Sequence, residues 1–425
     1  MRIPIIKATA TSKEVLKICS RSASQSEKIE KLVKEILLNV KKNGLIAAVP
    51  YAQRYDGLMK NNLRVSEVEI KRAASKIDSD LKNALKQAIE NVKIFHQKQT
   101  EKSWTFEGKD GEVLGQKIRP LKRVGLYVPG GAGIYPSTLI MNAVPALVAG
   151  VKELVVVRPI KNGLHSSVAY VLLELGIKEV YHIGGAQAIG LLAYGASGIL
   201  PVDKIVGPGN VFAAFAKKEV FGTVDIDMIA GPSEIAVLAD GAANPEWVAA
   251  DMLSQAEHGS GFEASICATD SLDFAKKLAA CIKEQVKASP KREILEKSLR
   301  AYGRIFLAKD MKEAVNIVNR IAPEHLEIVA KNQDELEKMV ENAGAIFIGS
   351  YSSEPVGDYF AGPNHVLPTN GTARFASPLG VYDFLKRTSI IRYSRKALEK
   401  NGANIAKIAD SEGFYHHKRA IMVRL

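Results

Sequence analysis

The chain has few cysteines. Its 425 residues include only Cys19, Cys267 and Cys281, and no two of them have the spacing of a redox or metal-binding pair. This small, odd number of thiols excludes a disulfide framework and is typical of a reducing compartment. None of the three lies next to the histidine clusters described below, which argues against a cysteine nucleophile.

Long apolar segments are also missing. The most apolar stretch, residues 139–151, is short and contains Asn142 and Pro145, which argues against a membrane span. The first residues lack the apolar region of a signal peptide. We therefore expect a cytoplasmic protein that does not interact with a membrane.

Acidic residues are fewer than basic ones, 46 against 58, and the net charge is +12. Such an excess is compatible with a nucleic-acid-binding protein or with a lysine-rich, solvated surface. The lysines are spread along predicted helices, and no basic patch is interleaved with aromatic residues. This distribution favours the solvated surface and a partner other than nucleic acid.

The apolar pattern predicts an α/β protein. Residues 24–43 and 64–98 are expected to be helices, because apolar residues recur at three- and four-residue intervals. Residues 104–114 predict a hairpin that is interrupted by glycines. From residue 123 onward, strands, glycine-rich turns and helices alternate, which is typical of parallel sheets.

Two α/β regions follow one another along the chain, and the second lacks the segments that would complete its core. We therefore predict that one domain is inserted in the other. The predicted parts are an N-terminal tail segment (1–20), a discontinuous α/β domain with the catalytic residues (21–128 and 233–378), an inserted Rossmann-like domain (129–232) and a helical C-terminal tail (379–425).

Two glycine-rich turns are candidates for a phosphate-binding loop. Residues 129–133 and 207–210 allow backbone N–H groups to approach a phosphate, although neither matches a dinucleotide fingerprint. Ordinary strand–helix turns explain them equally well. Tyr127, Gln187 and Asn210 lie at predicted carboxyl ends of strands, where open parallel sheets bind ligands.

Five of the eight histidines lie in short polar clusters. The clusters are Gln255 with His258, Glu324 with His325, Asp358 with His365, and Glu412 with His416 and His417. Imidazole and carboxylate groups supply metal ligands and general acids or bases near neutral pH. Any one pair is compatible with an ordinary surface, but their repetition beside turns predicts one site that is assembled from distant segments.

Helical spacing makes two predictions about these clusters. Gln255 and His258 are three residues apart and share a helix face. Glu412 and His416 also share a face, whereas His417 points about a hundred degrees away. Spacing alone therefore favours His416 over His417.

The order of the motifs resembles that of the histidinol dehydrogenase family over nearly the whole chain. The resemblance is carried by Val128–Gly131, Tyr135–Thr138, Gly184–Gly190, Val206–Asn210, Ile229–Glu234, Asp251–Gly259, Ala322–Leu326 and Gly362–Pro368. It implies two incomplete Rossmann-like units, arranged as in aldehyde dehydrogenases, which agrees with the missing fingerprint.

The resemblance also implies roles for individual residues. The zinc ligands would be Gln255, His258, Asp358 and His417, and the acid/base pair would be Glu324 and His325. Other substrate contacts would come from Ser233, His365 and Glu412, with Glu354 as a weaker candidate, and the zinc ligands and His325 would contact the substrate as well. Tyr127, Gln187 and Asn210 would contact NAD. His417 replaces His416 because His417-Lys-Arg-Ala matches the family pattern.

The activity implied by the resemblance is a zinc-dependent oxidation of L-histidinol to L-histidine through L-histidinaldehyde. It would use two NAD and one zinc ion per subunit, in the last steps of histidine biosynthesis. The family forms a homodimer with an intertwined tail, so His417 and Glu412 would serve the partner's site. Ligands of this type also accept manganese or cobalt.

Three alternatives come from other classes of protein. A zinc hydrolase would use the same ligand types but would not need a nicotinamide pocket. A cysteine-dependent aldehyde dehydrogenase would need a thiol near the cofactor. A basic nucleic-acid-binding protein would be retained on DNA at physiological salt, so poor retention would exclude this class.

Overall fold

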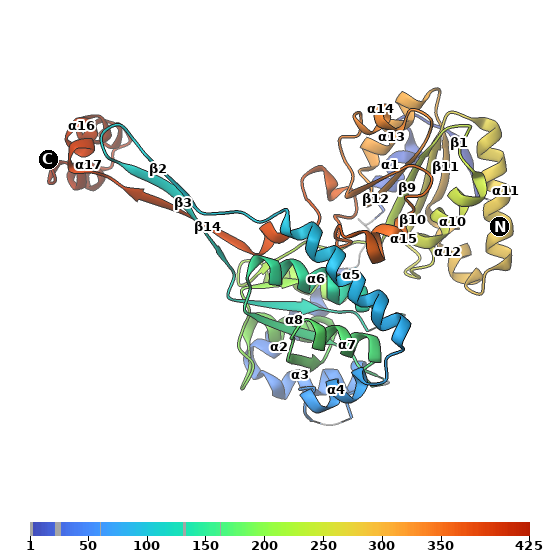
Figure 1. Ribbon diagram of the computed structural model, residues 1–425, viewed down its shortest axis with the longest axis horizontal. Helices are drawn as coiled ribbons and strands as arrows, with labels where there is room; N and C mark the ends of the chain where they lie inside the picture. The colour runs from blue at the N-terminus through green and yellow to red at the C-terminus, as the bar shows by residue number, and fades with distance from the viewer. Residues whose placement is uncertain (1–2, 22–26, 60, 131–132, 162) are drawn as a thin grey trace.

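The computed structural model contains two parallel α/β units and a long arm (Figure 1). The structure describes residues 3–21, 27–59, 61–130, 133–161 and 163–425. Within these ranges, no helix combines the length and the apolar character that crossing a membrane requires.

One unit is built on a six-stranded parallel sheet. In spatial order its strands are β1 (Ile5–Lys7), β11 (Gly303–Leu307), β10 (Ala264–Thr269), β9 (Glu234–Ala239), β12 (His325–Val329) and β13 (Ala345–Ile348). Helices α10 (Pro245–Ala256), α11 (Leu272–Ala288) and α12 (Arg292–Tyr302) cover one face, and α1 (Lys13–Cys19), α13 (Met311–Ile321) and α14 (Gln333–Glu337) cover the other. The central strands β9 and β10 are buried throughout, as expected for strands covered on both faces.

The other unit is built on a five-stranded parallel sheet. In spatial order its strands are β6 (Glu179–His182), β5 (Glu153–Arg158), β4 (Arg123–Tyr127), β7 (Lys204–Val206) and β8 (Asp225–Ile226). One face packs against α2 (Glu27–Asn43), α3 (Leu45–Tyr51), α8 (Gly185–Tyr194) and α9 (Val211–Val220). The other packs against α4 (Glu67–Ala74), α5 (Ser79–Gln97), α6 (Pro136–Ala149) and α7 (Ser166–Glu174). The strand order reverses between β4 and β7, which places a ligand crevice outside their carboxyl ends.

The domain boundaries differ from the sequence prediction. Residues 5–19 are not a separate tail, because β1 pairs with β11 and α1 packs on the six-stranded sheet. Helices α2 to α5 and strand β4 belong to the five-stranded unit, since the apolar faces of these helices bury the surface of that sheet. One unit is still inserted in the other, but it begins about a hundred residues earlier than the composition indicates.

The arm projects away from both units (Figure 1). The predicted hairpin is present as β2 (Trp104–Glu107) and β3 (Val113–Pro120), and β14 (Leu385–Arg392) pairs antiparallel with β3. Helices α16 (Arg395–Ser411) and α17 (Tyr415–Met422) lie at its tip. The segment after residue 379 is therefore only partly helical, because its first long element completes a three-stranded sheet.

Ion pairs attach α16 to the hairpin turn. Lys400 and Lys396 lie 2.6 and 3.4 Å from the carboxylate of Asp110. The hydroxyl of Ser394 donates to the Asp110 carbonyl and accepts the N–H of Ala397, which caps the helix. The arm is therefore one folded piece that carries its own tip.

Candidate active site

The predicted catalytic residues gather at the amino-terminal edge of the six-stranded sheet. Ser233 precedes β9, and Glu324 and His325 stand at the start of β12. Gln255 lies in the last turn of α10, and His258 lies in the turn that follows the helix. Further ligands come from a short segment after β13, which forms α15 (Glu354–Val356) and the π-helical turn η2 (Gly357–Ala361).

Two contacts hold His325, one with a backbone carbonyl and one with a carboxylate side chain. Its Nδ1 lies 3.1 Å from the carbonyl oxygen of Glu234, which fixes Nδ1–H as the donor. Its Nε2 has no hydrogen-bond partner among the described residues and lies 3.4 Å from Oδ1 of Asp358. The imidazole is therefore oriented, with one nitrogen free for chemistry.

Glu324 is buried beside His325. Its Oε2 accepts the N–H of Glu234 at 2.9 Å and lies 3.7 Å from Nδ1 of His325. Burial raises the pKa of Glu324 to about 7, against the opposing charge of His325. A carboxyl group with such a pKa exchanges protons readily at neutral pH.

Negative charge accumulates around the imidazole. Burial alone would lower the pKa of His325, but Glu324, Asp358 and Glu354 outweigh it and raise the pKa to about 10. Burial, followed by the charge of Asp358, raises the pKa of Glu354 to about 8. Burial opposes ionisation of Asp358 too, yet the close contact with His325 and the charge of His365 lower its pKa. Such a cluster favours a cationic ligand.

The residues at this edge fit a divalent cation. The Oε1 of Gln255 is buried without a hydrogen-bond partner, which is unfavourable unless a ligand completes it. Burial lowers the pKa of His258, and the nearby charge of Asp358 opposes this effect. The Nδ1 of His258 lies 3.4 Å from the Ser233 hydroxyl. Candidate ligand atoms of His325, Glu354 and Asp358 lie within 4.8 Å of one another. Asp358 belongs to this group and to the predicted ligand set.

The residues predicted from the tail do not reach this cluster within one chain. Glu412, His416 and His417 are exposed, between and on the two helices at the tip of the arm. Figure 1 shows that tip far from α10 and β12. The ring centroids of His417 and Phe414 lie 5.0 Å apart, and the ring of His416 packs against that of Tyr415.

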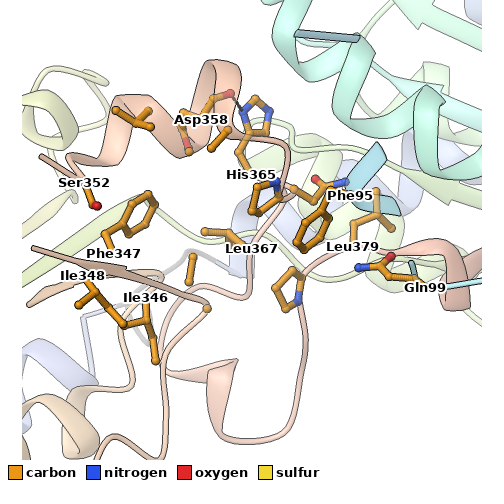
Figure 2. Close-up of a pocket in the computed structure, with 18 of the residues that line it drawn as sticks. Phe95, Gln99, Ile346, Phe347, Ile348, Ser352, Asp358, His365, Leu367 and Leu379 are labelled. Carbon is orange, nitrogen blue, oxygen red and sulfur yellow. Dashed lines mark hydrogen bonds between the residues drawn. The ribbon is translucent and has the colours of Figure 1, made fainter. Parts of the chain in front are cut away.

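A cavity of about 420 Å³ adjoins the cluster (Figure 2). Asp358 and His365 line it together with Phe347 of β13 and Phe95 of α5. Nδ1 of His365 donates to the Asp358 carbonyl at 2.9 Å, the contact that Figure 2 marks. The predicted substrate contact His365 is therefore positioned on the cavity wall by the predicted metal ligand.

The predicted cofactor residues lie at the carboxyl edge of the five-stranded sheet. The hydroxyl of Tyr127 accepts the N–H of Gly185 at 3.0 Å, and burial raises the pKa of Tyr127 to about 12. Nε2 of Gln187 donates to Asp56 at 3.2 Å. Asn210 is exposed and caps α9 through its Oδ1. All three therefore shape the turns of the crevice.

The glycine turns at this edge are closely packed. Gly207 has a φ of 114°, and a Cβ there would lie 2.2 Å from the carbonyl oxygen of Tyr127, so only glycine fits. In the other turn, Gly131 and Ala132 lie outside the described residues. The buried ion pair of Lys217 and Asp227 holds the turn at Gly207. Lys217 donates to the carbonyl of Gly207, and Asp227 accepts the N–H of Gly207.

Several buried charged residues near the site were not expected from the sequence. Asp56 accepts the N–H of Gly184 in the crevice. Arg21 pairs with Glu234 at 2.9 Å beneath the catalytic edge. Glu327 of β12 accepts the N–H of Glu354 at 2.7 Å. Arg21 lies in a turn, Asp56 at the end of a short π-helical turn and Glu327 in a short strand, and no cluster of polar residues in the sequence marks them as parts of the site.

Comparison with known proteins assigns the family. The family model for histidinol dehydrogenase matches residues 19–425. The chain is 51% identical to the histidinol dehydrogenase of Bacillus subtilis (strain 168) over 401 residues, 94% of each chain. It is 47% identical to the histidinol dehydrogenase of Aquifex aeolicus (strain VF5), in a match that covers 96% of this chain and 95% of that protein.

A solved structure is similar as well. The crystal structure of histidinol dehydrogenase from Elizabethkingia anophelis superposes with a TM-score of 0.93 at 32% identity, and covers 100% of this chain and 98% of that chain. Matches of this extent leave no large part of the fold unaccounted for. The chain therefore belongs to the histidinol dehydrogenase family, a family of oxidoreductases of histidine biosynthesis.

Proposed function

We propose that this chain oxidises L-histidinol to L-histidine through a bound L-histidinaldehyde, with zinc and two NAD per turnover. The observation that carries the proposal is the oriented His325, whose Nε2 lies 3.4 Å from Oδ1 of Asp358 and whose Nδ1 lies 3.7 Å from Oε2 of the buried Glu324. The family assignment supports the substrate, and the residues supply an order of events.

The metal site is proposed to consist of Gln255, His258, Asp358 and the His417 of a second copy. The unpartnered Oε1 of Gln255 supports this set, since nitrogen and oxygen donors suit zinc. When bound there, zinc would act as a Lewis acid that anchors nitrogen atoms of the substrate and fixes its carbinol carbon. Glu354 stands beside the set and adds negative charge.

His325 is proposed to remove the proton of the alcohol. Its Nδ1–H is bonded to the Glu234 carbonyl, so Nε2 is the atom that accepts. The surrounding carboxylates raise the pKa of His325 and therefore stabilise the imidazolium that forms. A divalent cation bound to Asp358 would offset part of this negative charge and so favour the neutral imidazole, the form that accepts the proton. NAD, when bound, would supply the hydride acceptor, and this chain would orient both reactants.

Glu324 is proposed to activate the water that hydrates the aldehyde. Its pKa of about 7 leaves a large fraction of the group ionised at neutral pH and makes it an effective base. His325 would then accept the proton of the hydrate in the second oxidation. No thiol is needed, and Cys267 is buried in β10, with its pKa well above the ordinary value because of that burial.

NAD is proposed to bind in the crevice of the five-stranded unit. Tyr127, Gln187 and Asn210 surround the point where the strand order reverses. The chain is proposed to work as a homodimer, because the arm carries His417 and Glu412 away from their own site. In a symmetric dimer each arm tip would reach the partner's catalytic edge.

The direct test supplies histidinol with excess NAD⁺ and counts NADH per histidine formed. Two NADH per histidine are expected, with no aldehyde released. A ratio of one, with free aldehyde, would contradict the two-step oxidation. The same assay after a chelator, followed by addition of zinc, manganese or cobalt, identifies the metal that supports turnover.

A further inference from the structure

Among the described residues, one buried cation of the five-stranded unit lacks an ion-pair partner. Arg21, Arg123, Arg158 and Arg304 are the buried arginines of the described ranges. Arg21, Arg123 and Arg304 each pair with a carboxylate at 2.6–3.4 Å. The buried Lys204 and Lys217 are paired as well, with Asp225 and Asp227. Arg158 is 7% exposed, has no ion pair among the described residues, and its one hydrogen bond runs from Nη1 to the Ile134 carbonyl.

Burial makes the charge of Arg158 less favourable than it is in water, and a bound anion would offset this cost. Burying an isolated charge is unfavourable, and burial lowers the pKa of Arg158 with little compensation from its surroundings. The guanidinium has five N–H donors, and the single acceptor within the chain leaves most of them available. The fork of donors matches the oxygens of a phosphate.

The place of Arg158 in the sheet favours one phosphate group of a dinucleotide, the one on the ribose 2′-oxygen. Arg158 is the last residue of β5, the strand that follows the central β4 in chain and space. In dinucleotide-binding sheets an acidic residue beyond this strand binds the ribose 2′-hydroxyl of NAD, whereas an arginine accommodates the 2′-phosphate of NADP. Here the strand ends in a basic residue, and Lys161 adds a second positive charge three residues later.

The turns around Arg158 are packed to bring the backbone close. A Cβ on Gly130 would lie 2.6 Å from the carbonyl oxygen of Pro159, and one on Gly184 would lie 2.4 Å from the Pro159 ring. The carboxyl ends of β4, β5 and β6 therefore converge at the Arg158–Pro159 step. A nucleotide bound over this edge would place its adenosine ribose within reach of the guanidinium.

We propose that Arg158 binds the 2′-phosphate of NADP, so that the chain accepts NADP as well as NAD. The inference rests on the proposed function only for the presence of a dinucleotide crevice. The pyrophosphate, which NAD and NADP share, has the same chemistry as the 2′-phosphate toward a guanidinium, and the test separates the two.

The test measures equilibrium binding by calorimetry with adenosine 2′,5′-bisphosphate, 5′-ADP and 5′-AMP. The wild-type chain is expected to bind the 2′,5′-bisphosphate roughly 10- to 100-fold more tightly than 5′-AMP, as charge-assisted hydrogen bonds predict. Equal affinities would overturn the inference without any variant. Because no histidinol is present, the result does not depend on whether the chain oxidises it.

Two variants locate the effect. Arg158→Gln is expected to lose that 10- to 100-fold for the 2′,5′-bisphosphate, with a much smaller loss for 5′-ADP. Lys152→Gln removes the same charge at the exposed opposite end of β5 and is expected to keep the wild-type preference. Equal losses for both ligands in Arg158→Gln would assign the residue to the pyrophosphate, and no loss would remove it from the site; either result overturns the inference. Arg158→Lys, which keeps a charge, is expected to retain part of the preference.

Discussion

The Nε2 of His325 lies 3.4 Å from Oδ1 of Asp358, although one residue begins β12 and the other belongs to η2. This contact joins the acid/base pair to the predicted metal site. It also connects both to the cavity, because Asp358 lines that cavity and accepts a hydrogen bond from His365.

Replacing His325 tests its role as the base. His325→Asn is expected to lower kcat for histidinol oxidation by roughly 10²–10⁴-fold, the usual contribution of a positioned base. Bound metal should stay near wild type, since Asn leaves the predicted ligand set intact. His165→Asn, at the exposed N-cap of α7, is the matched control. Unchanged turnover in His325→Asn would remove this residue from the mechanism.

Metal content tests the ligand set. Loss of a residue that only supports a ligand typically weakens metal binding 10- to 100-fold, so Gln255→Ala and His258→Ala should weaken it by at least about 100-fold. His417→Ala should do the same, and His416→Ala should retain the metal. The measurement is metal per chain after dialysis. Retention in His417→Ala with loss in His416→Ala would reverse the assignment of the tail.

Glu327 makes a pH-dependent contribution to stability. Burial, followed by the charge of Asp251, raises its pKa from 4.5 to about 9, so the folded chain keeps a proton that the unfolded chain releases. The free energy of unfolding of metal-free protein should therefore fall between about pH 5 and pH 9, by at most about 1.4 kcal/mol per pH unit.

Glu327→Gln should flatten this profile. The amide keeps an acceptor for the N–H of Glu354 and needs no proton, so stability is expected to decrease less steeply as the pH rises. Glu335→Gln on the exposed surface of α14 is the control. Denaturation by urea at several pH values measures both, and parallel profiles for wild type and Glu327→Gln would contradict the prediction.

The sequence indicates which polar residues meet at one edge of the six-stranded sheet better than it indicates the boundaries between the units. Gln255, His258, Glu324 and His325 can be found because polar clusters beside turns are unusual within apolar strands and helices. The apolar stripe of residues 27–43 shows that one face is buried but does not say against which sheet, and the domain boundary was therefore misplaced.

Other features leave little trace in the sequence. Strand β14 is mostly exposed on the arm, so no alternation of apolar and polar residues reveals it. Glu327 occupies one position of a short strand, where a lone carboxylate would be expected to face solvent. The place of His417 follows from the arm, whose length and direction depend on pairing between β3 and β14.

The most direct test of a site shared between two copies is complementation. One chain carries His325→Asn and the other carries His417→Ala, each with its own tag so that their amounts can be compared. The two are co-expressed and purified together, without separating the mixed dimers from the two kinds of homodimer. Either variant alone should be nearly inactive. Random pairing gives about half mixed dimers with one working site of two, so about a quarter of wild-type activity is expected. Activity no greater than that of the separate variants would contradict a site completed by the arm of a second copy.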